Sequence, residues 1–193
     1  MVRLQILTIV YKIKQIIGGH SLIIFNKRLR QQGCFVVGLE FAAQAVEEFF
    51  ADNKIEFKIQ KFDDYEIYTA DGYKIYRGDF FTIPISEKFD FIYDRASIVA
   101  IDPELKPVSF EILSCVPYII LFQNYAERLK KLMNGEMLLI ALVREEGRTG
   151  PPHTVSSDDV NALYENVKKI CEEDDLSSVE RMGKLVESVY LIN

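Results

Sequence analysis

Charged residues stand where several apolar, strand-like segments of this sequence end. Glu40 closes the segment FVVGLE, and Asp79 follows the segment YKIYRG. The pair Asp94-Arg95 follows FDFIY. In an open α/β sheet, ligands bind outside the carboxyl ends of the strands, near the point where the strand order reverses. Polar residues at neighbouring strand ends therefore predict a ligand site.

Each of these residue types suits a different part of a nucleoside-like ligand. The two oxygens of a carboxylate such as Glu40 suit the two vicinal hydroxyls of a ribose. Asp79 could accept from the amino group of an adenine, while Phe80 and its neighbour form an apolar slot around the ring. The guanidinium of Arg95 suits bidentate capture of a carboxylate.

The same residues also have structural interpretations that the sequence leaves open. Glu40 precedes a helical segment, and an acid at that place favours the helix dipole. Asp79 could be a solvated loop residue beside two core aromatics. Asp94-Arg95 could form a local or cross-strand salt bridge, and Gly150-Pro151-Pro152 could be a rigid connection and not the edge of a substrate pocket.

Net charge and apolar patterning exclude two classes of partner. The chain of 193 residues has a formal net charge of -6, whereas a nucleic-acid binder carries a basic patch. The apolar N-terminal region is broken by Arg3, Lys12 and Lys14, so no run reaches the roughly 18 residues of a membrane-spanning helix. We therefore expect neither a nucleic-acid partner nor a membrane partner.

The cysteines and histidines carry no recognisable metal or disulfide pattern. Cys34, Cys115 and Cys171 form an odd set without CxxC spacing, which predicts reduced thiols and a cytoplasmic protein. The chain has two histidines, and no zinc-ligand spacing can be assembled from them. We expect no metal site.

Strand-like and helix-like segments alternate along the chain, which predicts a mostly parallel sheet with helices on its faces. A turn at Asp71-Gly72 predicts a hairpin. No repeat or interface signature is visible, so a single-domain monomer is expected. The expected strands are 34–40, 89–93, 136–143 and 188–192, the hairpin is 65–77, and the expected helices are 42–50, 125–133 and 157–171.

Four blocks of the chain resemble the thiopurine S-methyltransferase family, in the same order. The combination GDFF, FDFIYDRA, AIDP and GPP is specific, although each piece alone is weak. The blocks are Gly33–Phe50, Ile75–Pro103, Tyr125–Leu142 and Gly150–Tyr164.

The resemblance implies an α/β fold with a Rossmann-like, seven-stranded class I methyltransferase sheet, mostly parallel with an antiparallel C-terminal strand. It implies methyl transfer from S-adenosylmethionine to a small-molecule thiol. Little general-base chemistry is needed if that thiol is acidic, because the thiolate is the nucleophile. The residues implied to bind the cofactor are Glu40, Asp79, Phe80 and Arg95, with Arg95 also catalytic, and those implied to border the acceptor are Pro151, Pro152 and Arg181.

Two segments of the domain, residues 1–32 and 107–124, depart from the family pattern. The family has a PLCGKS-like loop that cradles the methionine end of the cofactor, and here only GGHS is similar to it. Residues 107–124 are apolar and intervene between AIDPELK and YAERLKKL. A catalytically weak or inactive methyltransferase-like binding module is therefore the alternative. A nicotinamide-dependent oxidoreductase is disfavoured because no GxGxxG follows a strand.

Overall fold

The structure is a computed structural model that describes residues 5–10, 29–95, 97–101, 118–144, 150, 152–175 and 185–193. For residues 5–10, 118–120 and 175 it describes the backbone alone. The strands are β1 (Gln5–Val10), β2 (Phe35–Glu40), β3 (Lys58–Lys61), β4 (Glu66–Ala70), β5 (Tyr73–Arg77), β6 (Phe89–Arg95), β7 (Met133–Arg144), β8 (Val167–Asp175) and β9 (Leu185–Ile192). The helices are α2 (Ala43–Asn53), η2 (Ile98–Ala100), α3 (Tyr118–Leu132) and α4 (Ser157–Leu163).

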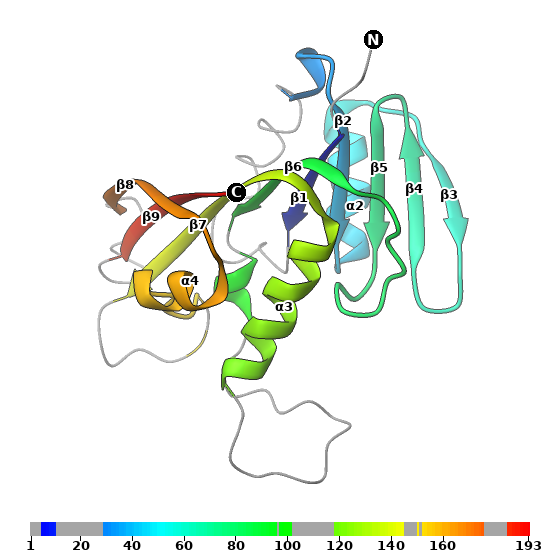
Figure 1. The fold of residues 1–193 in the computed structure, drawn as a ribbon. Helices are drawn as coiled ribbons and strands as arrows, with labels where there is room; N and C mark the ends of the chain where they lie inside the picture. Colours follow the sequence, from blue (N-terminus) through cyan, green and yellow to red (C-terminus); the bar gives the residue numbers. More distant parts are fainter. Residues whose placement is uncertain are drawn as a thin grey trace, which may run out of the picture.

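The nine described strands form one mixed sheet in the order β3-β4-β5-β2-β1-β6-β7-β9-β8 (Figure 1). The five strands from β5 to β7 are mutually parallel. From β1 the chain moves outward to β2 and β5, and then returns to β6 on the other side of β1. The strand order thus reverses between β1 and β6, where a ligand crevice is expected at the carboxyl ends.

The sheet separates two hydrophobic cores. Along β2, Val36 packs with α2, whereas Val37 and Leu39 join the core beneath α3 and α4. This alternation follows from the two-residue period of a strand. Figure 1 shows α2 behind the β2–β5 part of the sheet, and α3 nearer the viewer, beside β1 and β6. Both faces of β2 are therefore covered, as its apolar sequence requires.

The strand count differs from the seven strands that the resemblance implies. The described part of the chain has nine strands, not seven, and four of its eight strand pairings are antiparallel. The hairpin of β3 and β4 adds two strands beyond β5. The α/β class and the antiparallel C-terminal strand, β9, are confirmed.

The expected helix at 157–171 is wrong in its second half. α4 ends at Leu163, and the residues from Val167 onward form β8, which pairs with β9 over its whole length. The sequence VKKICEEDD has charges at helical spacing, but pairing with a neighbouring strand overrides that weak local preference. The N-cap of α4 is Ser156, which forms a capping box with Asp159.

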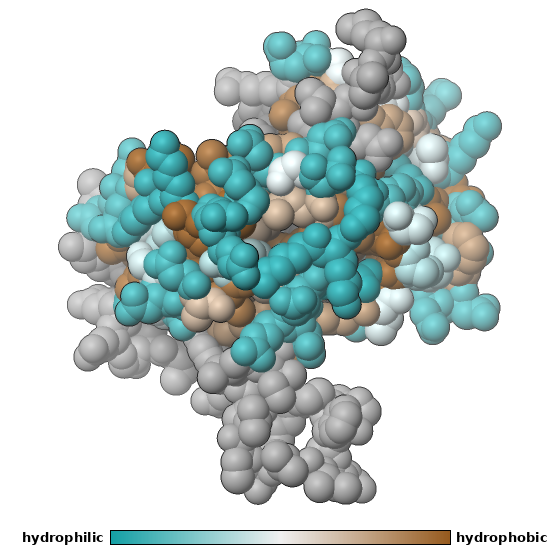
Figure 2. Space-filling view, in the orientation of Figure 1, coloured by the Kyte–Doolittle hydropathy of each residue, from teal (hydrophilic) through white to brown (hydrophobic). Residues whose placement is uncertain are grey.

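Hydrophobic side chains reach the surface at the edge of the sheet formed by β3. Figure 2 shows hydrophobic atoms on that side of the molecule, and the exposed residues there are Phe57, Ile59 and Phe62. β3 also carries Lys58 and Lys61, and lysines on an edge strand oppose pairing with another chain. No helix in the described part of the chain combines the length and apolar character that a membrane span needs.

Candidate active site

The strand registers bring Glu40, Asp79 and Arg95 to one edge of the sheet, the edge formed by the carboxyl ends of the parallel strands β5, β2, β1 and β6. Glu40 is paired with Val10 of β1, and Ile9 of β1 is paired with Asp94. Arg95 therefore stands level with Val10, one strand away from β1 on the opposite side to Glu40. Two strand spacings separate the Glu40 and Arg95 backbones by about 10 Å.

Glu40 is a buried carboxylate at the end of β2. Its side chain and backbone together are 8% exposed, and Oε1 accepts a hydrogen bond of 2.8 Å from the backbone N–H of Ala42. Burial raises the pKa of Glu40 to about 7, and backbone hydrogen bonds from Ala42 and Phe41 only partly oppose this. The carboxylate therefore bonds the backbone just before α2, in line with its structural interpretation, and ribose binding by Glu40 stays a prediction.

The loop after β5 is attached directly to the end of β2. Gly78 donates its backbone N–H to the carbonyl oxygen of Glu40 at 2.9 Å. Gly78 has φ of 151°, and a Cβ there would lie 3.1 Å from Cβ of Tyr65 and 3.2 Å from the carbonyl oxygen of Asp64. Glycine is therefore required where the chain turns away from the sheet toward Asp79.

Asp79 organises its own loop. Its Oδ1 accepts a hydrogen bond of 2.9 Å from the N–H of Phe81, and its carbonyl oxygen accepts from the N–H groups of Thr82 and Ile83. Such local bonding is typical of an Asx turn. The predicted solvated-loop role is thus incomplete, because the carboxylate fixes the backbone at this point.

Phe80 points into the protein interior. Its ring is 1% exposed and lies 4.8 Å from the ring of Tyr125, measured between centroids. The guanidinium carbon of Arg128 lies 5.1 Å from the same ring centroid. Phe80 therefore supports the Asp79 loop from inside, whereas the neighbouring Phe81 is only partly buried.

Asp94 is the most deeply buried charged group in the described residues. It is 0% exposed, and it accepts hydrogen bonds from the hydroxyl of Tyr125 at 2.9 Å and from the N–H of Ser97 at 3.3 Å. Burial raises the pKa of Asp94 to about 6, although these hydrogen bonds oppose the shift. The carboxylate thus joins the end of β6 to α3 and to the turn before η2.

Arg95 forms the cross-strand salt bridge that was one of its two predicted roles. Its Nη2 lies 3.5 Å from Oε1 of Glu187 on β9, and the two side chains are 24% and 23% exposed. A pair this exposed contributes little to stability. The guanidinium is therefore held near the edge by a partner that an anionic ligand group could replace.

Pro152 lies beside the turn that follows Arg95. It is buried, and the N–H of the next residue, His153, donates to the carbonyl oxygen of Val99 at 2.6 Å. Arg144, the last residue of β7, donates to the carbonyl oxygens of Pro152, at 2.8 Å, and Gly150. Both predicted roles of the proline segment, rigid connection and pocket border, remain compatible with this position.

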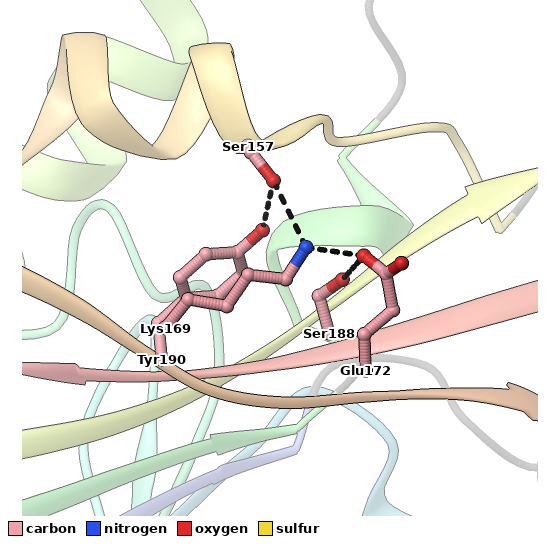
Figure 3. Close-up of polar contacts among 5 residues, drawn as sticks. All are labelled: Ser157, Lys169, Glu172, Ser188 and Tyr190. Atoms are coloured by element: carbon pink, nitrogen blue, oxygen red, sulfur yellow. Dashed lines mark hydrogen bonds and ion pairs between the residues drawn. The ribbon is translucent and has the colours of Figure 1, made fainter.

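A second polar network fastens α4 to the C-terminal hairpin (Figure 3). The Ser157 and Tyr190 hydroxyl oxygens are 2.7 Å apart, and Lys169 Nζ donates to Ser157 Oγ at 3.4 Å. Lys169 also pairs with Glu172, which accepts from the Ser188 hydroxyl at 3.0 Å. Every polar group drawn has a partner, so we assign this network a structural role.

Two predicted site residues, Pro151 and Arg181, lie outside the described residues. Within the described residues, no three His, Cys, Asp or Glu side chains gather as metal ligands. Tyr125, Arg128 and Arg144 contact the site but were missed by sequence reasoning. The available signal was weak: Tyr125 and Arg128 are three residues apart in the helix expected at 125–133, so they share one face of it.

These groups place hydrogen-bond acceptors on one side of the edge and a positive charge on the other. Glu40 and the Asp79 loop offer acceptors on the β5–β2 side, and Arg95 offers a cation on the β6 side. The arrangement suits a ligand with a polar nucleoside-like part and an anionic part.

Comparison with known proteins identifies the family and the fold of the chain. Residues 26–192 match the thiopurine S-methyltransferase family. The thiopurine S-methyltransferase of Vibrio campbellii is 32% identical over 176 residues, which cover 81% of this chain and 70% of that protein. The Pseudomonas syringae pv. tomato protein of the same name is 30% identical over 174 residues, or 83% of this chain and 72% of that protein.

The fold is also that of solved methyltransferases. The N-methyltransferase NodS from Bradyrhizobium japonicum, solved in complex with S-adenosyl-L-homocysteine, superposes with a TM-score of 0.57 at 10% identity over 98% of this chain and 78% of that chain. At such identity the likeness concerns the fold alone. The family match over most of the chain is the stronger finding, and the chain belongs to the thiopurine S-methyltransferase family of S-adenosylmethionine-dependent methyltransferases.

Proposed function

We propose that this protein transfers the methyl group of S-adenosylmethionine to the sulfur of a small-molecule thiol. The observation that carries the proposal is the position of Glu40, a buried acid at the end of β2 beside the reversal of strand order, in a chain of this family. The small, odd number of cysteines without CxxC spacing is in keeping with action in the cytoplasm.

The residues present fit the donor. The buried Glu40 carboxylate offers acceptors to ribose hydroxyls, and the Asp79 carboxylate could take an adenine amino group, with Phe80 supporting the loop from inside. Arg95 offers its guanidinium to the carboxylate of the methionine part, in place of Glu187. When bound, the donor supplies an electrophilic methyl group on a sulfonium.

The remaining task of the protein is to orient the acceptor and exclude water. Methyl transfer forms a bond from the acceptor sulfur to the methyl carbon and breaks the carbon–sulfonium bond, while the thiol proton leaves to solvent. Proximity and alignment supply most of the acceleration in such a displacement. In our proposal Arg95 borders donor and acceptor, and Pro151, Pro152 and Arg181 line the acceptor side.

We also propose that strands β5-β2-β1-β6-β7-β9-β8 are the seven-stranded class I methyltransferase core and that the β3–β4 hairpin is an addition to it. These seven strands are continuous in the sheet, six of them run in one direction, and β9 alone is antiparallel to its two neighbours, which supports this division. Deletion of the hairpin should then leave donor binding intact, provided that the newly exposed edge of β5 is made polar.

Donor binding tests the proposal directly. Calorimetric titration with S-adenosylhomocysteine should give a micromolar Kd, and methyl transfer should be seen with a thiopurine or with thiophenol. Glu40→Gln should weaken binding about tenfold or more, since it removes a charged hydrogen-bond acceptor. The matched control is Glu47→Gln, an exposed glutamate of α2, which should bind like the wild type.

Arg95→Ala separates binding from transfer. We expect it to reduce kcat/KM about 100-fold, whereas Glu187→Gln should leave transfer within a few-fold of the wild type, because the competing salt-bridge partner is removed. Donor binding without transfer to any thiol would support the non-catalytic alternative. No binding of either S-adenosyl compound would refute the proposal.

A further inference from the structure

The helix α3 contacts both halves of the candidate edge through two side chains on one face. Tyr125 and Arg128 are three residues apart, a spacing that places side chains on the same side of a helix. Tyr125 reaches Asp94 at the end of β6, and Arg128 reaches the loop after β5. These two strand ends are separated by β2 and β1 in the sheet.

We propose that Tyr125 and Arg128 are positioning residues that hold the two halves of the donor-binding edge at a fixed separation. This inference rests on the proposed function, because it assigns roles in binding and transfer to residues that need not touch either substrate. It goes beyond that function by giving Tyr125 and Arg128, one helical turn apart on α3, separate kinetic effects.

Arg128 holds the Asp79 loop in place. Its guanidinium donates to the carbonyl oxygens of Phe81, at 3.3 Å, and Ile83, and it covers the ring of Phe80. Burial lowers the pKa of Arg128, and the charge of Asp79 acts against that shift. A planar guanidinium can bond two carbonyls at once, which lysine cannot reproduce.

One helical turn earlier, Tyr125 holds the end of β6 in place. It is 2% exposed, and its hydroxyl donates to Asp94 Oδ2, while Asp94 Oδ1 accepts from the N–H of Ser97. The chain between Asp94 and Ser97 begins with Arg95. Fixing Asp94 therefore fixes the backbone from which the Arg95 guanidinium projects.

The two contacts are joined by packing. The ring of Phe80 lies against the ring of Tyr125 and beneath the guanidinium of Arg128. A shift of α3 would move both strand ends together, since Phe80 is 1% exposed and has no free space. Misplacement of a reacting group by about 1 Å from such a shift can cost about 100-fold in rate.

Conservative variants test the roles of Arg128 and Tyr125 separately. Arg128→Lys should raise the Kd of S-adenosylhomocysteine about five- to tenfold and change kcat less than about twofold, because the loop at the adenine side is loosened. Tyr125→Phe should lower kcat for a thiol acceptor such as thiophenol about five- to tenfold and change that Kd less than about twofold.

Tyr68→Phe is the matched control. Tyr68 is also 2% exposed and also donates its hydroxyl to a carboxylate, Glu66 Oε2, at 3.0 Å, but both residues are on β4, outside the strands β5, β2, β1 and β6 whose ends form the edge. Tyr68→Phe removes the same kind of hydrogen bond as Tyr125→Phe and should lower the free energy of unfolding by a similar amount. It should leave the Kd of S-adenosylhomocysteine and kcat unchanged. A purely structural role for Tyr125 would make the two tyrosine variants alike.

A pH profile adds a readout that packing alone does not move. The charged and titratable groups around Asp94 are Tyr125 from α3, Tyr164 at the end of α4, and Tyr93 and Arg95 from β6. The Tyr125 hydroxyl lowers the pKa of Asp94, so its removal should move the acid limb of kcat to higher pH. Tyr68→Phe should leave that limb in place.

Amide hydrogen exchange measures, without any ligand, how firmly Arg128 holds the Asp79 loop and Tyr125 holds the end of β6. The amides of Thr82 and Ile83 should exchange faster in Arg128→Lys, and that of Ser97 in Tyr125→Phe. If Tyr125→Phe does not fold, Asp94→Asn removes the charge from the other partner. A wild type that binds and transfers while all three variants match Tyr68→Phe would overturn this inference alone. A wild type that does neither would overturn the proposed function as well.

Discussion

At the scale of single residues, two buried carboxylates set the expected chemistry of the site. Glu40 is 8% exposed and Asp94 is 0% exposed, and burial raises the pKa of both. Neither ionised group has an ion pair among the causes of its shift, and backbone and hydroxyl donors stabilise each carboxylate only in part. A ligand that brings further hydrogen-bond donors to Glu40 would therefore be bound most tightly when that group is ionised.

Donor affinity should depend on pH through Glu40. With a pKa of about 7 in the free protein, and binding to the ionised form only, the Kd of S-adenosylhomocysteine should rise about tenfold from pH 8 to pH 6. Calorimetry across this range checks the slope. Glu40→Gln should bind weakly but with a flat pH dependence, whereas Glu47→Gln should keep the wild-type slope.

Asp94 should make the protein less stable as pH rises. Its pKa is raised from 3.8 to about 6, so the folded state holds the proton more tightly than the unfolded state, and stability is lost between these values. The contribution is about 3 kcal/mol in the free energy of unfolding. Urea denaturation at pH 4 and pH 6.5 should show this loss in the wild type relative to Asp94→Asn, and parallel curves for the two proteins would contradict it.

At the scale of elements, short polar networks decide how the helices sit on the sheet. α4 has only seven residues, too few to be stable alone, and is held by its capping box and by the Ser157–Tyr190 contact (Figure 3). α3 is longer and is anchored through Asp94. The positions of α3 and α4 on the sheet thus depend on contacts made by hydroxyl groups.

Loss of the α4 anchor should be measurable. Tyr190→Phe removes the hydroxyl that contacts Ser157 and should reduce the free energy of unfolding by about 1 kcal/mol. Chemical denaturation gives the value. Tyr65→Phe is the control, since the Tyr65 hydroxyl makes no hydrogen bond to another described residue, and a loss of equal size in both variants would argue against the anchor.

At the scale of the whole molecule, binding at the edge should stabilise the entire sheet. The edge joins strands β5, β2, β1 and β6, and a ligand that binds only the folded state stabilises it by about 2.7 kcal/mol at 100 times its Kd. For a chain of this size, Tm should rise by roughly 5–10 °C. Differential scanning fluorimetry with S-adenosylhomocysteine measures this, and no shift at saturating ligand would contradict a site at the edge.

Much of the fold followed from local pattern. The turn at Asp71-Gly72, the helix within 42–50 and the strand within 136–143 were predicted because turn residues, helix formers and apolar runs act over a few residues. The error at 167–171 arose because β8 exists only through its pairing with β9.

Sequence alone determined which chemical groups end which strands: Glu40, Asp79 and Arg95 could be named because strand periodicity and chain order are local properties. The tertiary structure decided that Phe80 faces inward, that Arg95 is paired with Glu187, and that α3 joins both halves of the edge. These facts depend on contacts between residues distant in the chain, whose geometry no local pattern contains.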